Sequence, residues 1–547
     1  LQLSNVSLLL NPETVAGIAN TDSGTLTADH VLIDAPDNPY YSVPLNGFGI
    51  LNEGNITLTD SVVRNLETNY YANANHSSVI NRGSMRLERS SITGNFGHYQ
   101  SRAVSGIDNA GYLLGNGLKV YRNGYYCYNC DGDPAGIVNR NGATLKLMDS
   151  EITSNHSSAV YGADFAGLNN FGRAELERVK IDRNTGGAFN RDSGYLRLVD
   201  SSVSGNYAYP HARLGAGVFN RGSSAKLVLS GVTVSGNYAY YSNKAGVING
   251  DSYRPGGEMI ITNSTISNNF DRDGYYCNYS VQNWGSMTIT SSTLCGELIN
   301  GVDATLSLSR TLITAPFGWD YGYGAVTGGV LTNEGTILKS EYNLFGDSRL
   351  TSAEAFDGFT PGPTDVVVTS DSAQPTALKD IVELTTYVGN RLLAVKDNGG
   401  PTLTVALVPG SPAIDAAGTH CEPTDQRGVT RPQGRACDIG AFEAPASFAP
   451  IVELSDLDGN NGFMINGVAV DDTAGRSVSD AGDINGDGIA DLLLGAPEAD
   501  QDADEEARGA SYVVFGRDPA SAGDFPASIE LSALDGSDGF ALTGNDY

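Results

Sequence analysis

The sequence of 547 residues lacks any run of 18 or more apolar residues, and basic residues are scarce, with 33 Lys and Arg against 63 Asp and Glu. The first absence excludes a membrane span in this chain. The formal net charge of −30 argues against nucleic acids and anionic membrane surfaces as partners, because both require a positive footprint. It is compatible with divalent cations and with an extracellular or cell-surface location. Leu1–Val6 already has the pattern of a strand and not of a signal peptide, so we expect a processed or truncated start.

Cysteine is also sparse, and its six copies fall into three close pairs: Cys127 with Cys130, Cys277 with Cys295, and Cys421 with Cys437. In a chain expected to be secreted, this pattern favours disulfides. The first pair is alternatively half of a zinc site or a redox motif. No second Cys-x-x-Cys or paired His lies near it, so disulfides are the preferred prediction.

Helical periodicity is nearly absent, and one repeat dominates residues 1–345 instead. A leading Asn is followed by an alternating apolar pair, such as Met85 and Leu87, then by Ser, an aliphatic residue and a second Asn. Alternation at period two places both apolar side chains on one face of a strand. The leading Asn recurs at Asn52, Asn81, Asn109, Asn139, Asn169, Asn190, Asn220 and Asn249, and the second Asn at Asn65, Asn95, Asn123, Asn155, Asn184, Asn206, Asn237 and Asn269.

One copy is too small to bury a core, whereas copies stacked in register bury a continuous apolar column. The corner Asn side chains can then hydrogen-bond along a ladder. We therefore predict an all-β fold in which residues 1–345 form a right-handed parallel β-helix of roughly 11–12 rungs.

The variable loops between rungs are rich in aromatic residues at one phase of the repeat. Stacking should align them into a longitudinal stripe with three possible roles: covering the sheet edge, subunit contact, or glycan binding. The candidate interaction residues are Tyr70, Tyr71, Tyr99, Tyr125, Tyr126, Tyr209, Tyr240, Tyr241, Tyr275, Tyr276, Trp319 and Tyr321.

The repeat fades over residues 346–444, which contain NGGPT at 398–402, ALVPGSPAID at 406–415, TDQRG at 424–428 and DIGAFE at 438–443. This string resembles the choice-of-anchor Q region of bacterial surface proteins. The resemblance implies terminal rungs and a cap that covers an open end of the column. Asp425, Arg427, Arg431 and Asp438 are either a catalytic cluster or, as we favour, part of a buried salt-bridged cap pinned by Cys421 and Cys437. Residues 445–450 are a short linker.

The sharpest chemical motif is the D-x-N-x-D-G-x-x-D loop from Asp483 to Asp491. Oxygen donors from the side chains of Asp483, Asn485, Asp487 and Asp491, with the carbonyl of Ile489, form a constellation suited to Ca²⁺. The residue at position 12 is Leu494 where an EF-hand has Glu, so we expect a calcium loop between β-strands. The alternative is an Asp-rich turn without a metal.

The flanking sequences, Gly475-Arg476-Ser477-Val478 before the loop and Gly495-Ala496-Pro497 after it, extend the likeness. This part of the chain resembles an FG-GAP repeat, the blade unit of integrin-α-like β-propellers, which implies that the loop residues are calcium ligands. Residues 451–547 then hold one blade and the start of a second, since Leu454–Gly459 is echoed by Leu531–Gly536.

These features favour a non-enzymatic secreted or cell-surface protein, a structural or adhesive stalk with a calcium-stabilised repeat. Its expected partners are cell-surface glycans, proteins or copies of itself in filaments or sheaths. The alternative is a polysaccharide-active lyase or hydrolase of the β-helix type, which requires acids and a base converging on one exposed sheet face. The charged strand positions alternate with core residues as a solvated face does, so we assign no catalytic residue.

Overall fold

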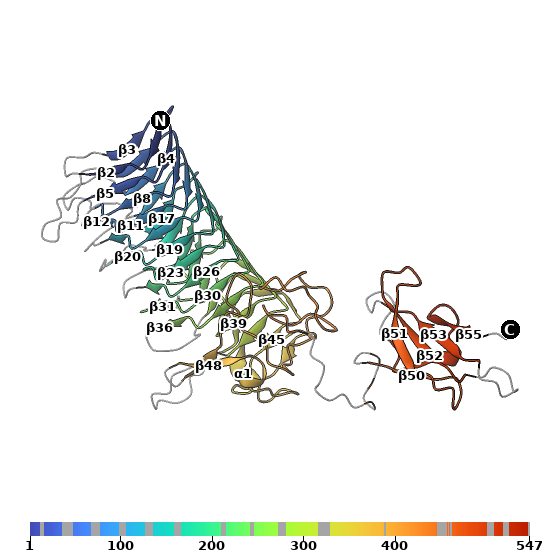
Figure 1. Cartoon of the computed structure of the whole chain (residues 1–547). Coiled ribbons are helices and arrows are strands. Elements are labelled where there is room, and N and C mark those ends of the chain that lie inside the picture. Colours follow the sequence, from blue (N-terminus) through green and yellow to red (C-terminus); the bar gives the residue numbers. More distant parts are fainter. Residues whose placement is uncertain are drawn as a thin grey trace. The chain divides into compact units, whose positions relative to one another are not determined.

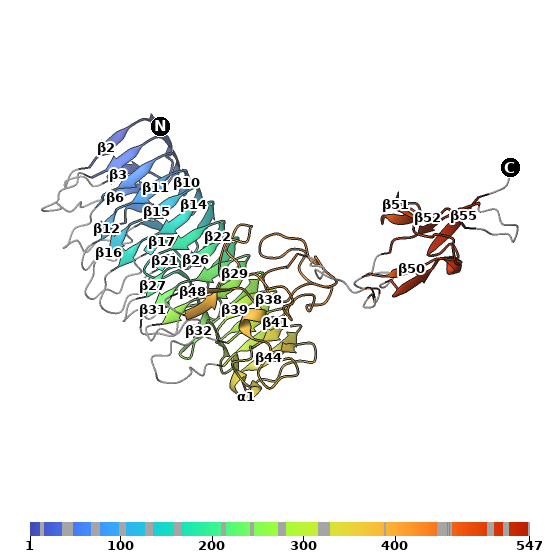
Figure 2. The same cartoon turned by 60° about the horizontal axis from the view of Figure 1, so that its bottom comes forward.

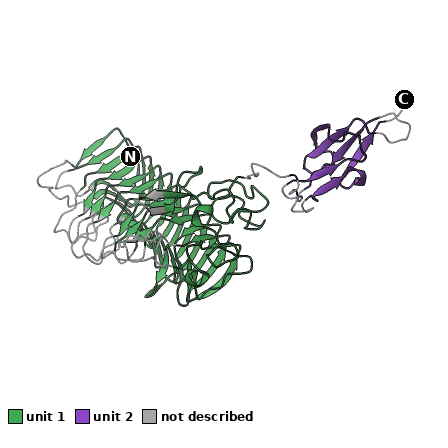
Figure 3. Cartoon of the chain, turned by 90° about the horizontal axis from the view of Figure 1, so that it is seen from below, with its two compact units in different colours: residues 1–445 green, residues 446–547 purple. Residues whose placement is uncertain are grey.

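The computed structural model describes residues 1–10, 16–35, 48–66, 77–97, 106–125, 135–157, 166–208, 215–240, 245–271, 280–315, 329–387, 390–445, 454, 457, 459, 462–499, 508–517 and 525–544. The chain divides into two compact units, residues 1–445 (unit 1) and 446–547 (unit 2) (Figure 3). Within the described residues, no helix has the length and apolar character needed to cross a membrane.

Unit 1 is built on three long sheets whose strands stack rung upon rung (Figure 1). Sheet A consists of β1 (Gln2–Ser4), β4 (Thr25–Asp29), β7 (Asn55–Thr59), β10 (Ser84–Glu88), β14 (Tyr112–Asn116), β18 (Thr144–Met148), β22 (Arg173–Glu177), β25 (Tyr195–Val199), β29 (Lys226–Ser230), β34 (Glu258–Thr262), β38 (Ser286–Thr290), β41 (Thr305–Ser309) and β44 (Thr336–Glu341).

Sheet B follows each sheet A strand after a sharp corner. It consists of β2 (Ser7–Leu9), β5 (Leu32–Asp34), β8 (Val62–Arg64), β11 (Ser91–Thr93), β15 (Lys119–Tyr121), β19 (Glu151–Thr153), β23 (Lys180–Asp182), β26 (Ser202–Ser204), β30 (Thr233–Ser235), β35 (Thr265–Ser267), β39 (Thr293–Cys295), β42 (Leu312–Thr314), β45 (Leu344–Phe345) and β47 (Val366–Val367).

Sheet C completes each rung. It consists of β3 (Ala16–Asn20), β6 (Phe48–Asn52), β9 (Val79–Asn81), β13 (Ile107–Asn109), β17 (Ala135–Asn139), β21 (Ala166–Asn170), β24 (Ala188–Arg191), β28 (Val218–Arg221), β32 (Val247–Asp251), β37 (Val281–Asn283), β40 (Leu298–Asn300), β43 (Leu331–Asn333) and β46 (Phe356–Asp357), with β33 (Arg254–Pro255) paired to β32.

The predicted all-β parallel solenoid is confirmed. Sheet A has 13 strands and sheets B and C have 14 each, slightly more than the rungs expected, because the divergent copies at both ends of the repeat region also pair. The alternating apolar residues form the core: Met85 and Leu87 are fully buried, and Met85 lies in register with Ile56 and Leu113 of the neighbouring rungs. Burying each such side chain contributes roughly 1.5–3 kcal/mol.

The leading Asn residues form a continuous ladder inside the corner that follows sheet C. Each side-chain amide donates to the next side-chain oxygen at 2.7–2.9 Å, through Asn20, Asn52, Asn81, Asn109, Asn139, Asn170, Asn190, Asn220, Asn249, Asn283, Asn300 and Asn333. One predicted member was wrong. Asn170 and not Asn169 is in the ladder, because the strand register pairs Asn170 with Asn139 and turns Asn169 to the opposite face.

A second ladder lies at the corner after sheet B. It joins Asn95, Asn123, Asn155, Asn184, Asn206, Asn237 and Asn269 through side-chain bonds of 2.9–3.1 Å. Asn65 was predicted to belong to it but does not. It stands one position earlier, at a positive φ of 58°, and its amide donates to Asp34 at 2.9 Å, while the main-chain N–H of Leu66 donates to Asn95.

The corner between sheets A and B has a left-handed residue in each rung. The residue after each sheet A strand has a positive φ, at Asn5, His30, Asp60, Arg89, Gly117, Asp149, Arg178, Asp200, Gly231, Asn263, Ser291, Arg310 and Tyr342. This conformation is costly for side chains other than Gly, Asn and Asp. Stacking of the rungs therefore imposes the corner on whichever residue occupies it.

The C-terminal end of the column is closed by a short helix and an aromatic cluster. Helix α1 (Ser352–Ala355) has a capping box between Thr351 and Glu354, and its buried Ala355 accepts a hydrogen bond from the N–H of Val330 at 2.7 Å. Beside it, the rings of Phe345, Phe356 and Phe359 pack edge to face with centroids 5.4–5.7 Å apart.

Residues 378–444, which we call the clasp, do not continue the column. They begin with a 3₁₀ turn (Leu378–Asp380) and a hairpin of β48 (Leu384–Tyr387) and β49 (Asn390–Leu393), and they pack against the outer face of sheet B beside β39 and β42 (Figures 1 and 2). Of the region 346–444 that was expected to form terminal rungs and a cap, only the part up to about residue 367 lies at the end of the column. The clasp covers its side.

Unit 2 contains an antiparallel four-stranded sheet in the order β51 (Ser477–Gly482), β52 (Asp491–Ala496), β53 (Ala510–Val514) and β55 (Gly539–Thr543). A parallel pair, β50 (Met464–Asn466) and β54 (Ser528–Glu530), and a 3₁₀ turn (Leu531–Ala533) complete it. Leu494, Tyr512 and Val514 of the sheet and Leu531 of the turn form its small core.

Candidate calcium loop and the buried cluster of the clasp

The candidate calcium loop connects β51 to β52, so both of its ends are fixed by a sheet. Residues 483–490 lie at the surface, while Asp491 at the start of β52 is only 3% exposed. Gly486 and Gly488 have φ values of +79° and +89°, and a Cβ at either position would meet nothing within 4 Å. The glycines are therefore required by backbone conformation and not by lack of space.

The side chains of the loop fold back onto its own N–H groups. Asp483 accepts hydrogen bonds from the N–H groups of Gly486 at 2.7 Å, Asp487 at 3.0 Å and Gly488 at 2.9 Å. Asn485 Oδ1 accepts from the N–H of Asp487 at 3.0 Å, and Asp487 Oδ1 accepts from the N–H of Ile489 at 2.8 Å. These bonds hold the loop in its curved form.

Asp491 ties the loop to the sheet. Its Oδ2 accepts from the N–H of Ile484 at 2.7 Å, and its Oδ1 accepts from the N–H of Gly516, beyond β53, at 2.9 Å. The buried carboxylate therefore anchors the loop, because one oxygen binds the start of the loop and the other binds the main chain after β53.

The donor set fits Ca²⁺. Three carboxylates, an amide oxygen and a main-chain carbonyl are the hard oxygen ligands that this ion prefers, and a carboxylate oxygen that accepts one N–H keeps a further lone pair. Among the described residues, the acidic, His or Cys side chains whose ligand atoms lie within 4.8 Å of one another in a group of three are Asp29, His30 and Asp60. The carboxylates of Asp483, Asp487 and Asp491 do not form such a group. An ion bound at the loop would supply the charge that draws these carboxylates together.

The Asp29, His30 and Asp60 group lies at the corner between sheets A and B. His30 Nδ1 is 2.8 Å from Asp29 Oδ2, and this contact raises the pKa of His30. Arg89 donates to both oxygens of Asp60 at 2.9 and 2.7 Å and lowers the pKa of that carboxyl. Because a guanidinium already neutralises Asp60, the group is a corner ion-pair network and a poor cation site.

A family match covers this loop and its flanking strands. Residues 475–514 match the FG-GAP repeat family. The matched range begins two residues before β51 and ends with β53, so the FG-GAP repeat spans three strands of the sheet and the whole candidate calcium loop.

Other comparisons add little to this assignment. No curated protein matches the sequence. Among solved structures, the crystal structure of pectate lyase Pel9A is similar over 72% of this chain and 88% of that chain, with 12% sequence identity and a TM-score of 0.29. This likeness is too low to bear on function. The resemblance of residues 346–444 to a choice-of-anchor Q region stays a prediction.

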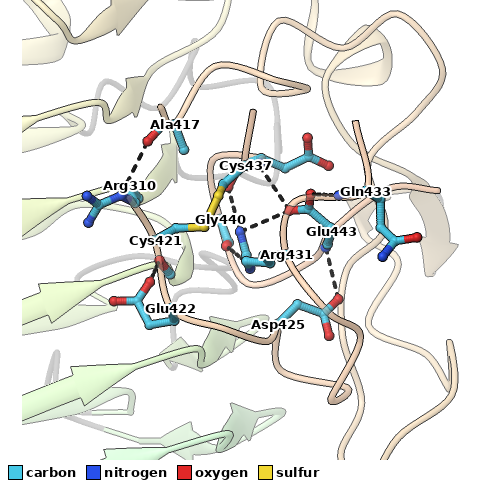
Figure 4. A network of polar contacts seen from close by, with 12 residues as sticks. Arg310, Ala417, Cys421, Glu422, Asp425, Arg431, Gln433, Cys437, Gly440 and Glu443 are labelled. Atoms are coloured by element: carbon cyan, nitrogen blue, oxygen red, sulfur yellow. Dashed lines mark hydrogen bonds and ion pairs between the residues drawn. A yellow bond between two sulfur atoms is a disulfide. The ribbon is translucent and has the colours of Figure 1, made fainter. Parts of the chain in front are cut away.

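The four charged residues singled out in the clasp come together, and Glu443 joins them. Figure 4 labels Asp425, Arg431 and Glu443 of this group. Arg431 and Glu443 have fully buried side chains 3.2 Å apart, and Arg427 pairs with the buried Asp425 at 2.7 Å. Arg431 also donates to the main-chain carbonyls of Asp438 and Gly440, both at 2.7 Å. The guanidinium groups thus serve the fold of the clasp.

The electrostatics of this cluster are those of buried, paired groups. Burial raises the pKa of Asp438 to about 7, opposed by hydrogen bonds from the N–H groups of Asp415 and Ala444. Burial also raises the pKa of Glu443 and lowers that of Arg431. Together with the disulfide between Cys421 and Cys437, this arrangement matches the buried, salt-bridged interpretation.

Two clasp residues were missed at the sequence level, Glu443 and Gln426. Both lie inside the strings TDQRG and DIGAFE, which were the only available signal. The side chain of Gln426 is 2% exposed and contacts Thr233 and Thr265 of sheet B, 193 and 161 residues away. No local pattern predicts contacts at that separation.

The remaining predicted residues are placed unevenly. Cys295 is disulfide-bonded, whereas Cys127, Cys130 and Cys277 lie outside the described residues. Of the twelve aromatic candidates, Tyr240 is described and Tyr125 is described for its backbone, in β16 (Gly124–Tyr125). The others, which are Tyr70, Tyr71, Tyr99, Tyr126, Tyr209, Tyr241, Tyr275, Tyr276, Trp319 and Tyr321, lie outside the described residues.

A described part of the aromatic loops does stack along the column. The strands β27 (Tyr207–Ala208), β31 (Tyr238–Ala239) and β36 (Phe270–Asp271) pair in parallel, which aligns Tyr207, Tyr238 and Phe270. Successive ring centroids are 5.1 Å apart, and Tyr240 packs edge-on against Tyr238 at 6.2 Å. The planes of Tyr207 and Tyr238 differ by 16°, so the sides of these two rings that face each other are not open to sugars.

Proposed function

We propose that this chain is a non-enzymatic secreted or cell-surface protein in which a β-solenoid stalk carries a calcium-stabilised FG-GAP repeat, with a structural or adhesive role. The observation that carries the proposal is the FG-GAP match on a sheet whose connecting loop presents oxygen donors suited to Ca²⁺. FG-GAP repeats are typical of extracellular proteins. The disulfide of the clasp is consistent with an oxidising compartment.

The role of the bound ion is electrostatic. Asp483, Asp487 and Asp491 place three formal negative charges in one short loop, and Ca²⁺ would neutralise part of this charge and join the loop to the sheet through Asp491. The residues of the chain hold the loop curved in advance, so the ion stabilises unit 2 by binding its folded form.

The experiment is calorimetry of the full chain with calcium or with a chelator. At a Ca²⁺ concentration of 100 Kd, linkage stabilises the folded unit by about 2.7 kcal/mol, which corresponds to a rise in Tm of roughly 10–20 °C for a domain of this size. The transition of unit 2 should move while the solenoid transition stays in place.

The matched variants are Asp483→Asn with Asp487→Asn, against Asp535→Asn, an exposed aspartate of the same unit whose oxygen caps Ser537. Titration calorimetry should show calcium binding to the wild type and to Asp535→Asn and none to the double variant. A wild-type Tm that is the same in calcium and in chelator would contradict the calcium assignment.

The enzymatic alternative has a direct assay. The carboxylates on the outer face of sheet A that lie near bases are ion-paired, as in Arg173 with Glu175, Lys146 with Glu175 at 3.3 Å and Lys226 with Glu258 at 2.9 Å. Incubation with acidic polysaccharides, read by reducing ends and by the absorbance of unsaturated products, should show no turnover. Turnover would replace the structural proposal with a lyase or hydrolase.

We also propose that the aromatic loops mediate lateral contacts with copies of this chain or with glycans. Replacement of Tyr70, Tyr125, Tyr240 and Tyr275 by Ser should disperse assemblies seen by light scattering and electron microscopy. The control is Tyr253→Ser, since Tyr253 is 94% exposed but lies in the β32–β33 hairpin. Assemblies that persist in the fourfold variant would count against lateral packing through these loops.

A further inference from the structure

The clasp is attached to the side of the column over several successive rungs. Thr402 Oγ1 donates to the carbonyl of Gly231 at 2.9 Å, and Asn263 Nδ2 donates to the carbonyl of Thr424 at 2.8 Å. Farther along, Arg310 Nε donates to the carbonyl of Ala417 at 3.3 Å. The corner residues that carry ion pairs in the earlier rungs thus bind the clasp in the later ones.

Gln426 forms a buried set of hydrogen bonds between the clasp and sheet B. Its Nε2 donates to the hydroxyls of Thr233 at 3.0 Å and Thr402 at 2.9 Å, and its Oε1 accepts from the hydroxyl of Thr265 at 2.6 Å. Both the nitrogen and the oxygen of the side-chain amide are hydrogen-bonded, and the residue is only 2% exposed. Separation of the clasp from sheet B would leave these buried groups unpaired until water enters.

The chain leaves unit 1 from this side wall. The N–H of Gly440 donates to the carbonyl of Arg310 at 2.9 Å, and the N–H of Ala441 donates to Thr293 Oγ1 at 3.0 Å, so both bonds reach the column. The N–H groups of Glu443 and Ala444 then donate to the carboxylates of Asp425 and Asp438 at 2.9 and 2.6 Å. Four of the last six residues before the linker are therefore each held by a hydrogen bond to a different partner.

The disulfide of the clasp limits how far this segment can be extended. Cys437 is bonded to Cys421, so a pull on residue 438 reaches residue 421 without extending the 16-residue segment between them. The same segment contains Arg427 and Arg431, whose ion pairs with Asp425 and Glu443 are buried. Breaking one partner away from such a pair exposes an uncompensated charge and is strongly unfavourable.

From this geometry we propose that the clasp is a mechanical attachment, which transfers tension from unit 2 into the side wall of the solenoid. The inference goes beyond the proposed function, because it concerns the response of unit 1 to force whether or not the chain binds calcium or a partner. Tension entering at residue 445 meets the column bonds, the buried cluster and the disulfide together. Unit 2, with a smaller core and no disulfide among its residues, yields first.

The test is single-molecule force spectroscopy of the full chain, held at its two ends. Unfolding of residues 446–547 should add about 35 nm of contour length, at roughly 3.4 Å per residue. Release of the clasp should follow at higher force as a separate step of about 18 nm, because the disulfide withholds about 5 nm. Under a reducing agent the clasp step should lengthen to about 23 nm and its force should fall.

A matched pair of variants isolates the contribution of the Gln426 side chain. Gln426→Ala should lower the force of the clasp step, whereas Gln433→Ala, an exposed glutamine of the same segment, should leave it unchanged. The proposal is overturned if the clasp step precedes the step of unit 2, if reduction leaves its length unchanged, or if both glutamine variants behave alike. The reduction arm uses the unaltered chain, so it decides the question even where Gln426→Ala fails to fold. Failure here would leave the calcium test intact.

Discussion

The Asn ladder supplies the sharpest test of the fold. Asn139 is fully buried and accepts from Asn109 at 2.7 Å while donating to Asn170 Oδ1 at 2.7 Å and to the carbonyl of Arg173 at 3.0 Å. Asn139→Ala leaves one N–H of Asn109 and the side-chain oxygen of Asn170 buried without a partner. At about 1–3 kcal/mol for each such group, the local loss is about 4 kcal/mol.

In a solenoid this loss is felt by neighbouring rungs, because stability is a sum of local terms. Hydrogen exchange followed by mass spectrometry should show the amides of β13, β17 and β21 exchanging roughly 10³-fold faster, since each 1.4 kcal/mol is a factor of ten. Amides of β41, six rungs away in sheet A, should keep their protection.

Two controls make the reasoning refutable. Asn139→Asp keeps the shape but places an acceptor against Asn170 Oδ1 and a charge in the core, so it should destabilise more than Asn139→Ala. Asn333→Ala removes the half-buried last member of the ladder and should cost about 1 kcal/mol. A uniform change over all rungs, or equal effects at positions 139 and 333, would refute the ladder as a local stabilising element.

Three further predictions concern the clasp and the aromatic stack. The pKa of Asp438 is raised to about 7 in the folded protein, so the folded state binds more protons than the unfolded state between about pH 4 and 7. The stability of the clasp should therefore fall as pH rises through this window. Thermal melts recorded across pH should show this fall in the wild type and a flatter dependence in Asp438→Asn. Gly440→Ala should destabilise the clasp more than Gly410→Ala. Both glycines have positive φ (+112° and +80°), but only a Cβ at position 440 would meet a neighbour, the hydroxyl oxygen of Thr293 at 2.9 Å. Hydrogen exchange of clasp peptides in the two variants measures the difference. Tyr238→Ser should lower the local stability of its rung by about 2–3 kcal/mol, since the ring stacks between two others, and Tyr253→Ser at an exposed site should not; exchange of the flanking strands separates the two.

The column could be predicted from the sequence because its determinants are local and repeated. The apolar pair of each copy, such as Met85 and Leu87, and the two Asn positions specify strand faces and corners within one rung. Errors arose where two residues competed for one place. Asn169 and Asn170 are adjacent, and only the register with Asn139 decides which of them enters the ladder.

The corner between sheets A and B was not predictable in the same way. Asp60, Arg89 and Asp149 all adopt positive φ there, although only some residue types favour it. The stacked rungs fix the backbone, and the side chains then form pairs between rungs, as Arg89 does with Asp60 at 2.7 Å and Arg178 with Asp149 at 2.7 Å. The conformation belongs to the assembly of rungs and has no signature in a single copy.

The clasp marks the limit of sequence reasoning most clearly. Its salt bridges and disulfide lie close in sequence and were expected, whereas its place on sheet B depends on contacts such as that of Gln426 with Thr233, 193 residues apart. The candidate calcium loop is the opposite case. Its donors are contiguous from Asp483 to Asp491, so the sequence alone names them, and the structure adds only that they presently hold the loop's own N–H groups.

The ladder geometry also explains how such a column tolerates variable loops. Successive ladder Asn residues are separated by as few as 17 residues, from Asn283 to Asn300, and by as many as 34, from Asn249 to Asn283, yet the two side-chain bonds are 2.8 and 2.9 Å long. In the short rung only Gly296 and Glu297 join β39 to β40. Changes of chain length are therefore absorbed outside the ladder, and the rung below and the rung above keep their spacing. A column built in this way separates rigidity, which the Asn ladders and the apolar core supply, from the length of the connecting segments, which is free to vary.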